Sequence, residues 1–211
     1  MEARATQLLT ELEIKSLLIR ERYYRDTSQW ENLRTSYHSD ASHTSIKITW
    51  FEGNIDNFVS ASKEMVNGGV HATHTIQPVE VHINGDKAIS ESTGSISIRF
   101  TLDDEDYDCV SYTRFISRFQ RVESEWKMLT LEAVYERDSI VPVTPVPPSV
   151  GNPKLVSTGV RDSYRWIGWL LSRKGFQIDP NLPGIDRPAF VTKLMEESWS
   201  WLEDCQAEKN Q

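Results

Sequence analysis

Residues 23–30 read Tyr-Tyr-Arg-Asp-Thr-Ser-Gln-Trp, and residues 71–74 read His-Ala-Thr-His. We interpret the first segment as the end of a helix that delivers Asp26, followed by a corner at Trp30. The second segment opens a strand that carries His74. The rest of the chain then forms a scaffold that brings Asp26 and His74 together in one pocket, followed by a tail that covers or extends it.

Apolar residues at helical spacing predict three helices around this stretch. The first covers residues 7–25, and its regular part can start at Thr10, which with Glu13 resembles a capping box. A shorter helix is expected over residues 29–37. The third follows Asn54, a residue that can cap a helix, and stops at Gly68.

Alternation of apolar and polar residues predicts strands in the remainder of the first 138 residues. A short strand is expected over 45–51, and four long ones over 73–83, 87–102, 107–121 and 126–137. The turn Asn84-Gly85-Asp86 favours a hairpin, and the acidic residues 103–106 form a second turn. Helices followed by an antiparallel meander predict an α+β fold, in which a curled sheet wraps the long helix as a cone with an open end for a ligand.

The C-terminal third differs in composition from the first 138 residues. Five prolines lie between Pro142 and Pro153. We therefore divide the chain into a domain at residues 1–138, a proline-rich linker at 139–153 and a helical extension at 154–211. The extension holds four of the seven tryptophans, which either pack on the cone or on a dimer partner, or form a lid over the pocket.

Composition restricts the possible partners and location. The chain has 211 residues, and its net charge of -8 argues against a nucleic acid partner. No apolar run is long enough for a membrane span, and the N-terminus lacks the apolar core of a signal peptide. Because only two cysteines occur, far apart in sequence, we expect a reducing, cytoplasmic setting.

These residues resemble a known family. A helix that ends Tyr-Tyr-Arg-Asp with Trp four residues later, a histidine that opens the long hairpin, and a closing Trp-Lys-Met strand at residues 126–128 are similar to the SnoaL-like group of NTF2-like cone-shaped proteins. The resemblance covers about residues 8–138. The SnoaL-like group includes polyketide cyclases, scytalone dehydratase and dehydrochlorinase. It implies that Asp26 and His74 form the catalytic pair, and that a dimer forms through the outer face of the sheet.

The resemblance also has departures. The asparagine that scytalone dehydratase carries on the third long strand falls near Arg114 or Phe115, and no counterpart of a second histidine is found, because that strand carries serines. The chemistry of the pair agrees with the implied role, since an imidazole oriented by a carboxylate can take and return a proton near neutral pH. A purely structural interpretation remains, with Asp26 at the surface and His74 as a buried, hydrogen-bonded residue.

Further polar residues are expected to line the cone and bind the substrate. Arg114 and Glu132 form either a structural ion pair or a site for a substrate oxygen, and Tyr24 and Tyr112 either donate to a carbonyl or serve as core residues. Trp50 is expected to supply apolar lining. His71 and His74 have no third partner at metal-ligand spacing, so neither a metal nor a cofactor is expected.

The sequence therefore predicts a cofactor-free lyase or isomerase, a dehydratase or cyclase that acts on a hydrophobic, oxygenated natural product such as a polyketide or terpenoid in secondary metabolism. His74 would act as general base and acid, and Tyr24, Tyr112 and Arg114 would hold the developing enolate oxygen. Two alternatives remain, namely a non-catalytic ligand-binding module and an accessory subunit that works beside an enzyme. The expected partners are a small hydrophobic substrate and a second copy of the chain, without nucleic acid or membrane.

Overall fold

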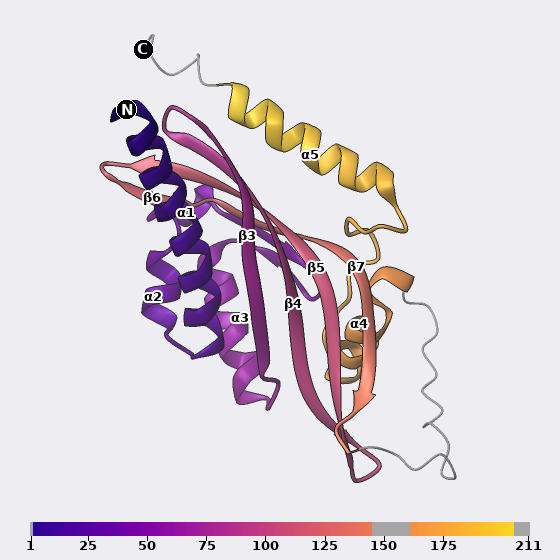
Figure 1. Ribbon diagram of the computed structural model, residues 1–211. Coiled ribbons are helices and arrows are strands. Elements are labelled where there is room, and N and C mark those ends of the chain that lie inside the picture. Colours follow the sequence, from indigo (N-terminus) through magenta and orange to yellow (C-terminus); the bar gives the residue numbers. More distant parts are fainter. Residues whose placement is uncertain (1, 145–160, 205–211) are drawn as a thin grey trace.

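The computed structural model describes residues 2–144 and 161–204 (Figure 1). Three helices come first, and they pack against one face of a curved sheet, which we term the inner face. These helices are α1 (Glu2–Asp26), α2 (Trp30–Thr35) and α3 (Ile55–Asn67), with a short 3-10 turn at Ala41–His43. The α+β cone expected from the sequence is confirmed.

The sheet has seven strands in the part of the chain that the structure describes. They are β1 (Ser45–Ile48), β2 (Phe51–Gly53), β3 (Ala72–Asn84), β4 (Lys87–Leu102), β5 (Glu105–Val122), β6 (Glu125–Met128) and β7 (Thr130–Pro142). Their order is β2-β1-β7-β5-β4-β3, with β6 paired to β5. β1 runs parallel to β7, and the other neighbours are antiparallel. The expected hairpin turn is present, with Gly85 at φ +61°.

Several expected bounds were wrong, among them those of the strand over residues 45–51, which is divided into β1 and β2. α1 begins at Glu2, so Thr10 lies inside the helix instead of capping it, and its hydroxyl accepts a hydrogen bond from Arg121 at 3.4 Å. The strand expected over residues 126–137 is two strands, β6 and β7, which are separated at Leu129 and pair with different parts of β5. β7 then continues to Pro142, so the first four residues of the expected linker belong to the sheet, while the linker from residue 145 onward lies outside the described residues.

The end of α1 is set by a hydrogen-bonded turn. Gln29 N donates to Tyr24 O at 2.8 Å, and Ser28 N donates to Arg25 O at 3.3 Å. This is the Schellman pattern, which satisfies the last carbonyl groups of a helix when the residue after the cap is left-handed. Ser28 takes that conformation with φ +59°. The turn makes Asp26 the last residue of α1 and so fixes where its carboxylate lies.

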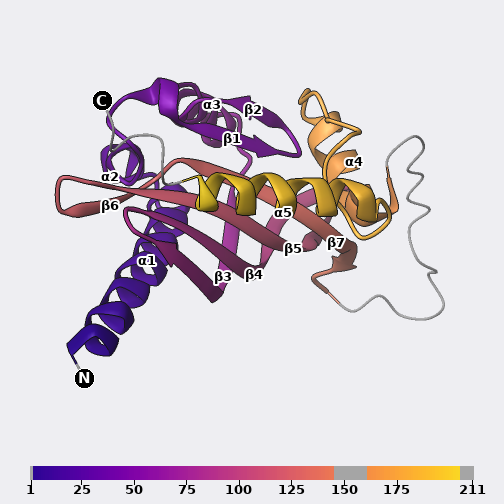
Figure 2. The ribbon, with the colours of Figure 1, turned by 90° about the horizontal axis from the view of Figure 1, so that it is seen from above.

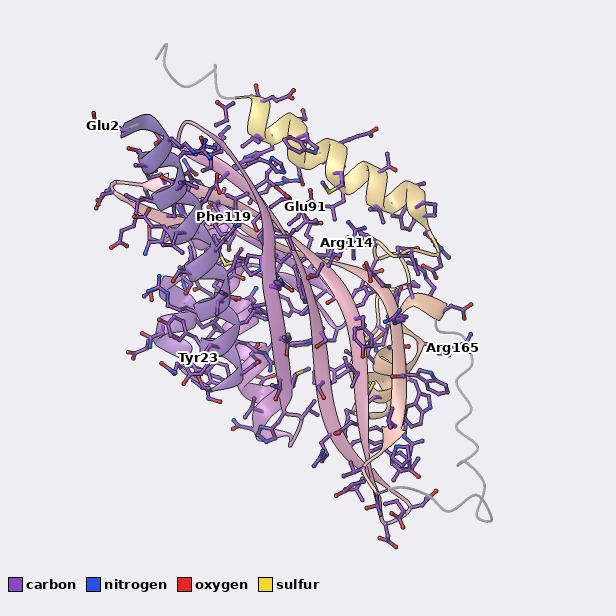
Figure 3. The ribbon with its side chains drawn as sticks, viewed as in Figure 1. Glu2, Tyr23, Glu91, Arg114, Phe119 and Arg165 are labelled. Carbon is purple, nitrogen blue, oxygen red and sulfur yellow. The ribbon has the colours of Figure 1, made fainter. Side chains whose placement is uncertain are left out.

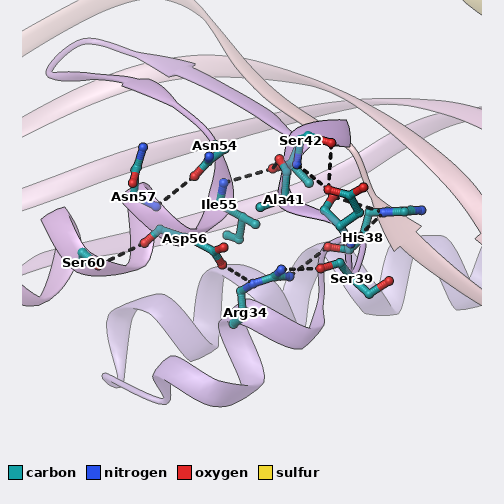
Figure 4. Close-up of polar contacts among 12 residues, drawn as sticks. Arg34, His38, Ser39, Ala41, Ser42, Asn54, Ile55, Asp56, Asn57 and Ser60 are labelled. Carbon is teal, nitrogen blue, oxygen red and sulfur yellow. Dashed lines mark hydrogen bonds and ion pairs between the residues drawn. The ribbon is translucent and has the colours of Figure 1, made fainter.

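Arg34, near the end of α2, links that helix to the start of α3 (Figure 4). Its guanidinium pairs with Asp56 and donates to the carbonyl oxygens of His38 and Ser39 at 2.8 and 2.7 Å. Asn54 caps α3, as predicted, by accepting from Asn57 N at 3.0 Å. These contacts join α3 to α2 and to the loop after α2, while the buried residues of α3 pack in the core of the inner face.

The C-terminal extension contributes a helix to each face of the sheet (Figures 1 and 2). α4 (Arg165–Arg173), which follows a 3-10 turn at Asp162–Tyr164, joins the core of the inner face. Its start is held by Asp138 of β7, whose carboxylate accepts from the backbone N–H groups of Trp166 and Ile167 at 2.7 and 2.8 Å.

α5 (Pro188–Glu203) lies on the opposite side of the sheet, which we term the outer face (Figure 1). It buries Leu194 and Leu202 with three outer-face residues of the sheet, Ile89, Ile116 and Val134. This helix of the same chain therefore covers part of the face through which the family resemblance implied a dimer.

Candidate functional site

A narrow cavity with about 30 Å³ of free space, open to solvent on one side, lies between the inner face of the sheet and α1, α3 and α4. We call it the dyad cavity. Most of its lining is apolar and comes from every part of the cone, including the extension: Ile48, Trp50, Phe58, Met65, Ala72, Ile96, Ile98, Phe115, Ile167 and Leu171. The polar lining residues are Arg22, Arg25, Thr49, His74 and Tyr135. A largely apolar pocket with a few convergent polar groups is typical of a small-molecule site.

Asp26 and His74 are in direct contact at this cavity. His74 Nδ1 lies 2.7 Å from Asp26 Oδ1, and the backbone N–H of His74 donates to Asp26 Oδ2 at 2.6 Å. Both carboxylate oxygens are thus engaged by the same residue, which fixes the ring against the end of α1. With Nδ1 directed at the carboxylate, Nε2 is the ring nitrogen left for a ligand.

The environment of His74 favours the neutral imidazole. Burial lowers the pKa of His74 below its ordinary value, the hydrogen bond and charge of Asp26 oppose that shift, and the charges of Arg22 and Arg25 reinforce it. A neutral imidazole near pH 7 can accept a proton, and the adjacent carboxylate stabilises the imidazolium that results.

Two buried arginines on α1 adjoin the dyad. The guanidinium of Arg22 forms a bidentate pair with Glu21, which also accepts a hydrogen bond from Tyr37 Oη at 3.0 Å. Arg25 is less well paired: its Nη2 lies 3.1 Å from Met65 Sδ, and its Nη1 lies 3.8 Å from Asp26 Oδ1. Burial, reinforced by Arg22, lowers the pKa of Arg25 to about 10.

Of the five residues expected to bind substrate, the structure places Trp50 in the cavity and the other four elsewhere. Tyr24 lies in a surface groove between α1 and β6, and Tyr112 is 40% exposed on the outer face. Arg114 pairs with Glu91 and Glu136 instead of Glu132, on the side of the sheet that faces α5 (Figure 3).

The error came from the choice of strand face. Successive residues of a strand point to opposite faces, so Tyr112, Arg114 and Ile116 share one face of β5 and Phe115 takes the other. Phe115 lines the dyad cavity, whereas Ile116 packs with α5. Glu132 lies near Arg118 and near Glu197 of α5, on the same outer side. A buried helix on each side of the sheet makes both faces partly apolar, and the strand pattern alone did not distinguish them.

Sequence reasoning missed Arg22 and Arg25. A signal was present, because the buried stripe of α1 contains Ile14 and Leu18 and continues at helical spacing into Glu21, Arg22 and Arg25. Charged residues on the buried face of an amphipathic helix require partners inside the protein, and such positions are candidates for a site.

The metal site considered for His71 and His74 has no third ligand among the described residues. His71 is exposed, and within residues 2–144 and 161–204 no group of three or more His, Cys, Asp or Glu side chains is arranged to hold a metal ion. The contacts of His74 are those with Asp26 described above.

Comparison with known proteins identifies the family of the chain. Residues 6–132 match the SnoaL-like domain. The chain belongs to this family. A PEP2-like protein from Fusarium vanettenii is 27% identical in an alignment 197 positions long that covers 88% of this chain and 82% of that protein. Pea pathogenicity protein 2 from the same fungus is 25% identical with the same coverage.

Solved structures support the fold of this SnoaL-like chain. A type 2 hexachlorocyclohexane dehydrochlorinase has a TM-score of 0.54 and 12% identity over 71% of this chain and 97% of that one. A protein from Novosphingobium aromaticivorans named for scytalone dehydratase has a TM-score of 0.53 and 15% identity over 68% and 93% of the two chains. At these identities the likeness concerns the fold alone.

None of the described helices of the SnoaL-like chain combines the length and the apolar character that crossing a bilayer requires.

Proposed function

We propose that this SnoaL-like protein is a lyase or isomerase that moves a proton on a hydrophobic, oxygenated substrate in the dyad cavity. His74 Nε2 takes a proton from a carbon next to a carbonyl group, and Asp26 holds the ring and stabilises the imidazolium. The observation that carries this proposal is the pair of contacts at 2.6 and 2.7 Å from one carboxylate to His74.

The electron balance of the step fits dehydration, isomerisation or cyclisation. When the C–H bond breaks, its electron pair forms the carbon–carbon double bond of an enolate, and the carbonyl π pair moves to oxygen. On collapse, the enolate expels a β-hydroxyl, which leaves as water with the proton from His74. If a second double bond is conjugated with the enolate, the γ-carbon takes that proton and the double bond moves. If the enolate carbon attacks a second carbonyl carbon of the same substrate, a ring closes, and the oxygen that receives the carbonyl π pair takes the proton. A β-hydroxy ketone of polyketide or terpenoid type suits both the mostly apolar lining and this chemistry.

The test is hydrogen exchange at the carbon next to the carbonyl, which requires no knowledge of the natural substrate. Hydrophobic ketones that bind the protein are incubated with it in D₂O, and replacement of the α-proton by deuterium is followed by NMR. We expect the wild-type protein to accelerate exchange and His74→Ala to lose about 10²–10⁴-fold of that rate, since a general base contributes about this much.

His82→Ala is the matched control, because His82 lies beside Trp199 at the outer face. It should leave exchange unchanged, and melting curves should show that both variants fold. Wild-type exchange rates in a folded His74→Ala protein would refute the proposal.

A ligand-binding module without chemistry is the second candidate function. It is favoured by the mostly apolar lining and by α4, whose Ile167 and Leu171 form part of the cavity wall. In that case ketones bind the wild-type protein and His74→Ala with similar affinity, and neither protein accelerates exchange.

A further inference from the structure

Arg25 is the charged group of the dyad cavity that has a large unused capacity to donate hydrogen bonds. A guanidinium carries five N–H donors. Among the described residues, the side chain of Arg25 reaches one hydrogen-bond acceptor, Met65 Sδ at 3.1 Å, and that sulfur is a weak one. The side chain is nevertheless only 3% exposed, and it lines the cavity together with His74. A buried guanidinium in this situation gains most from an oxygen atom inside the cavity.

The charges around the dyad indicate what kind of oxygen this is. Glu21 and Asp26 are acidic, Arg22 and Arg25 are basic, and burial keeps His74 neutral, so the cluster carries no net charge before a ligand binds. A neutral carbonyl leaves this balance unchanged when it binds, and its oxygen can accept from the guanidinium of Arg25. If the carbonyl becomes an enolate while His74 becomes cationic, the net charge of the cluster and its ligand stays at zero.

We infer that Arg25 binds the carbonyl oxygen of the substrate and holds the negative charge on that oxygen after His74 has removed the α-proton. This inference rests on the proposed function. It gives Arg25 the role that the sequence interpretation had assigned to Tyr24, Tyr112 and Arg114. The substrate class is then a neutral ketone or aldehyde with an acidic C–H bond, oriented with its oxygen toward α1. Donors placed where charge develops act most strongly in a cavity that excludes water.

The experiment uses 4-nitrophenol, whose anion resembles an enolate in charge and absorbs visible light, unlike the neutral phenol. The probe is titrated with pH in the presence of excess protein. With the wild-type protein we expect the bound phenol to ionise at least one pH unit below the free phenol, which is a tenfold preference for the anion. Arg25→Met should abolish this preference, and Arg25→Lys should retain part of it.

Arg114→Met is the matched control, because Arg114 is a partly buried arginine paired with Glu91 and Glu136 on the outer face. It should behave as wild type. Wild-type protein that binds only the neutral phenol, or fails to bind the probe, overturns the inference, as does an unchanged anion preference in Arg25→Met.

Failure of this inference can be told apart from failure of the proposed function. His74→Ala should keep the anion preference, since Arg25 supplies it, while losing α-proton exchange. Loss of the preference in Arg25→Met together with wild-type exchange in His74→Ala would uphold the oxygen site and refute the general base. The reverse pattern would uphold His74 and refute Arg25.

A separate observation concerns the surface of α1. Five large apolar residues on this helix are about half exposed or more: Leu8 at 55%, Leu9 at 61%, Leu12 at 63%, Ile19 at 49% and Tyr23 at 58%. At 100° per residue, Leu9 lies apart, and the other four fall within a stripe about 60° wide, which we call the α1 stripe. Figure 2 shows the N-terminal turns of α1 extending beyond the strands.

The α1 stripe is symmetrical about the middle of the helix. If two copies of α1 pack antiparallel across a two-fold axis between Lys15 and Ser16, Leu8 of one copy faces Tyr23 of the other and Leu12 faces Ile19. Glu13 and Arg20 lie along one flank of the stripe, so that each glutamate approaches the arginine of the other copy. A two-fold interface requires a patch that is complementary to itself in this way. We propose that the α1 stripe is the interface of a homodimer.

Sedimentation velocity tests this interface over a range of protein concentrations. The wild-type protein should dimerise, and Leu12→Glu should weaken the dimer at least 100-fold. Val141→Glu is the matched control, because Val141 is 52% exposed on β7, and it should leave the dimer intact. Ser16→Cys in a Cys205→Ser background should cross-link the dimer under oxidation. A monomeric wild-type protein, or a dimer that survives Leu12→Glu, would refute the proposal.

Discussion

His74 owes its protonation state to two opposing influences that the structure makes explicit. Burial lowers its pKa, while the hydrogen bond and charge of Asp26 raise it, and burial dominates. Both influences suit a general base. Burial favours the neutral imidazole before the reaction, and the carboxylate stabilises the imidazolium that forms in it.

The pKa of His74 should therefore lie below about 6.5, the ordinary value for histidine. NMR titration of the imidazole resonances checks this, with His74→Gln to assign the signal. Asp26→Asn should lower the pKa further, because it removes the group that opposes burial. A pKa above the ordinary value in the wild-type protein would contradict this account.

The same shift makes stability depend on pH. Between the two pKa values the unfolded chain binds a proton that folded His74 does not, so the free energy of unfolding should fall as pH drops below about 6.5. Denaturant unfolding at several pH values measures the effect. The His74→Gln variant should lose this part of the dependence, and His71→Gln, which alters an exposed histidine, should retain it.

At the scale of single elements, the end of α1 contains a conformation that serine tolerates poorly. Ser28 has φ +59°, in the left-handed region that costs an L-residue roughly 1–2 kcal/mol. Glycine avoids that cost but loses about 0.5–1 kcal/mol of chain entropy. Ser28→Gly should thus stabilise the protein by about 0.5–1 kcal/mol in denaturant unfolding. Ser28→Ala, which keeps the strain, should not, and equal effects of the two would argue against strain at this turn.

The attachment of α4 depends on one carboxylate. Asp138 accepts from two backbone N–H groups at the start of α4, and burial raises its pKa to about 6. Asp138→Ala should cost about 1–2 kcal/mol, as loss of a helix cap does. Asp138→Asn keeps an acceptor oxygen without the buried charge and should cost less. Thermal unfolding of both variants measures the difference, and identical losses would show that the acceptor oxygen is unimportant.

At the scale of the whole molecule, the two helices of the extension have separable roles. α4 supplies Ile167 and Leu171 to the dyad cavity, whereas α5 covers Ile89, Ile116 and Val134 on the outer face. A chain that ends at residue 186 lacks α5 alone. It should lose solubility and melting temperature through the uncovered apolar residues, yet still bind 4-nitrophenol.

A chain that ends at residue 145 lacks both helices and should lose probe binding as well. Calorimetry and absorbance titration of the two truncated proteins, compared with the full chain, measure these effects. Equal probe binding by all three chains would show that α4 is not a functional wall of the cavity.

Local patterns in the sequence determined much of this fold. The alternation of the long strands, the Asn84-Gly85-Asp86 turn and the cap at Asn54 each act over a few residues, so they can be read without the structure. The family motif at residues 23–30, together with His74, likewise indicated the pair that the structure brings into contact.

Only the tertiary structure decided which face of each strand lines the cavity. Arg114 was assigned inward because its strand alternates, but alternation gives two faces and does not say which one meets α1. The helices α4 and α5 settle this, since one packs inside the cone and the other outside, and no pattern within their own sequences distinguishes those positions. Arg25 acquires its setting in the same way, because the contacts that bury it come from residues as distant in sequence as Met65.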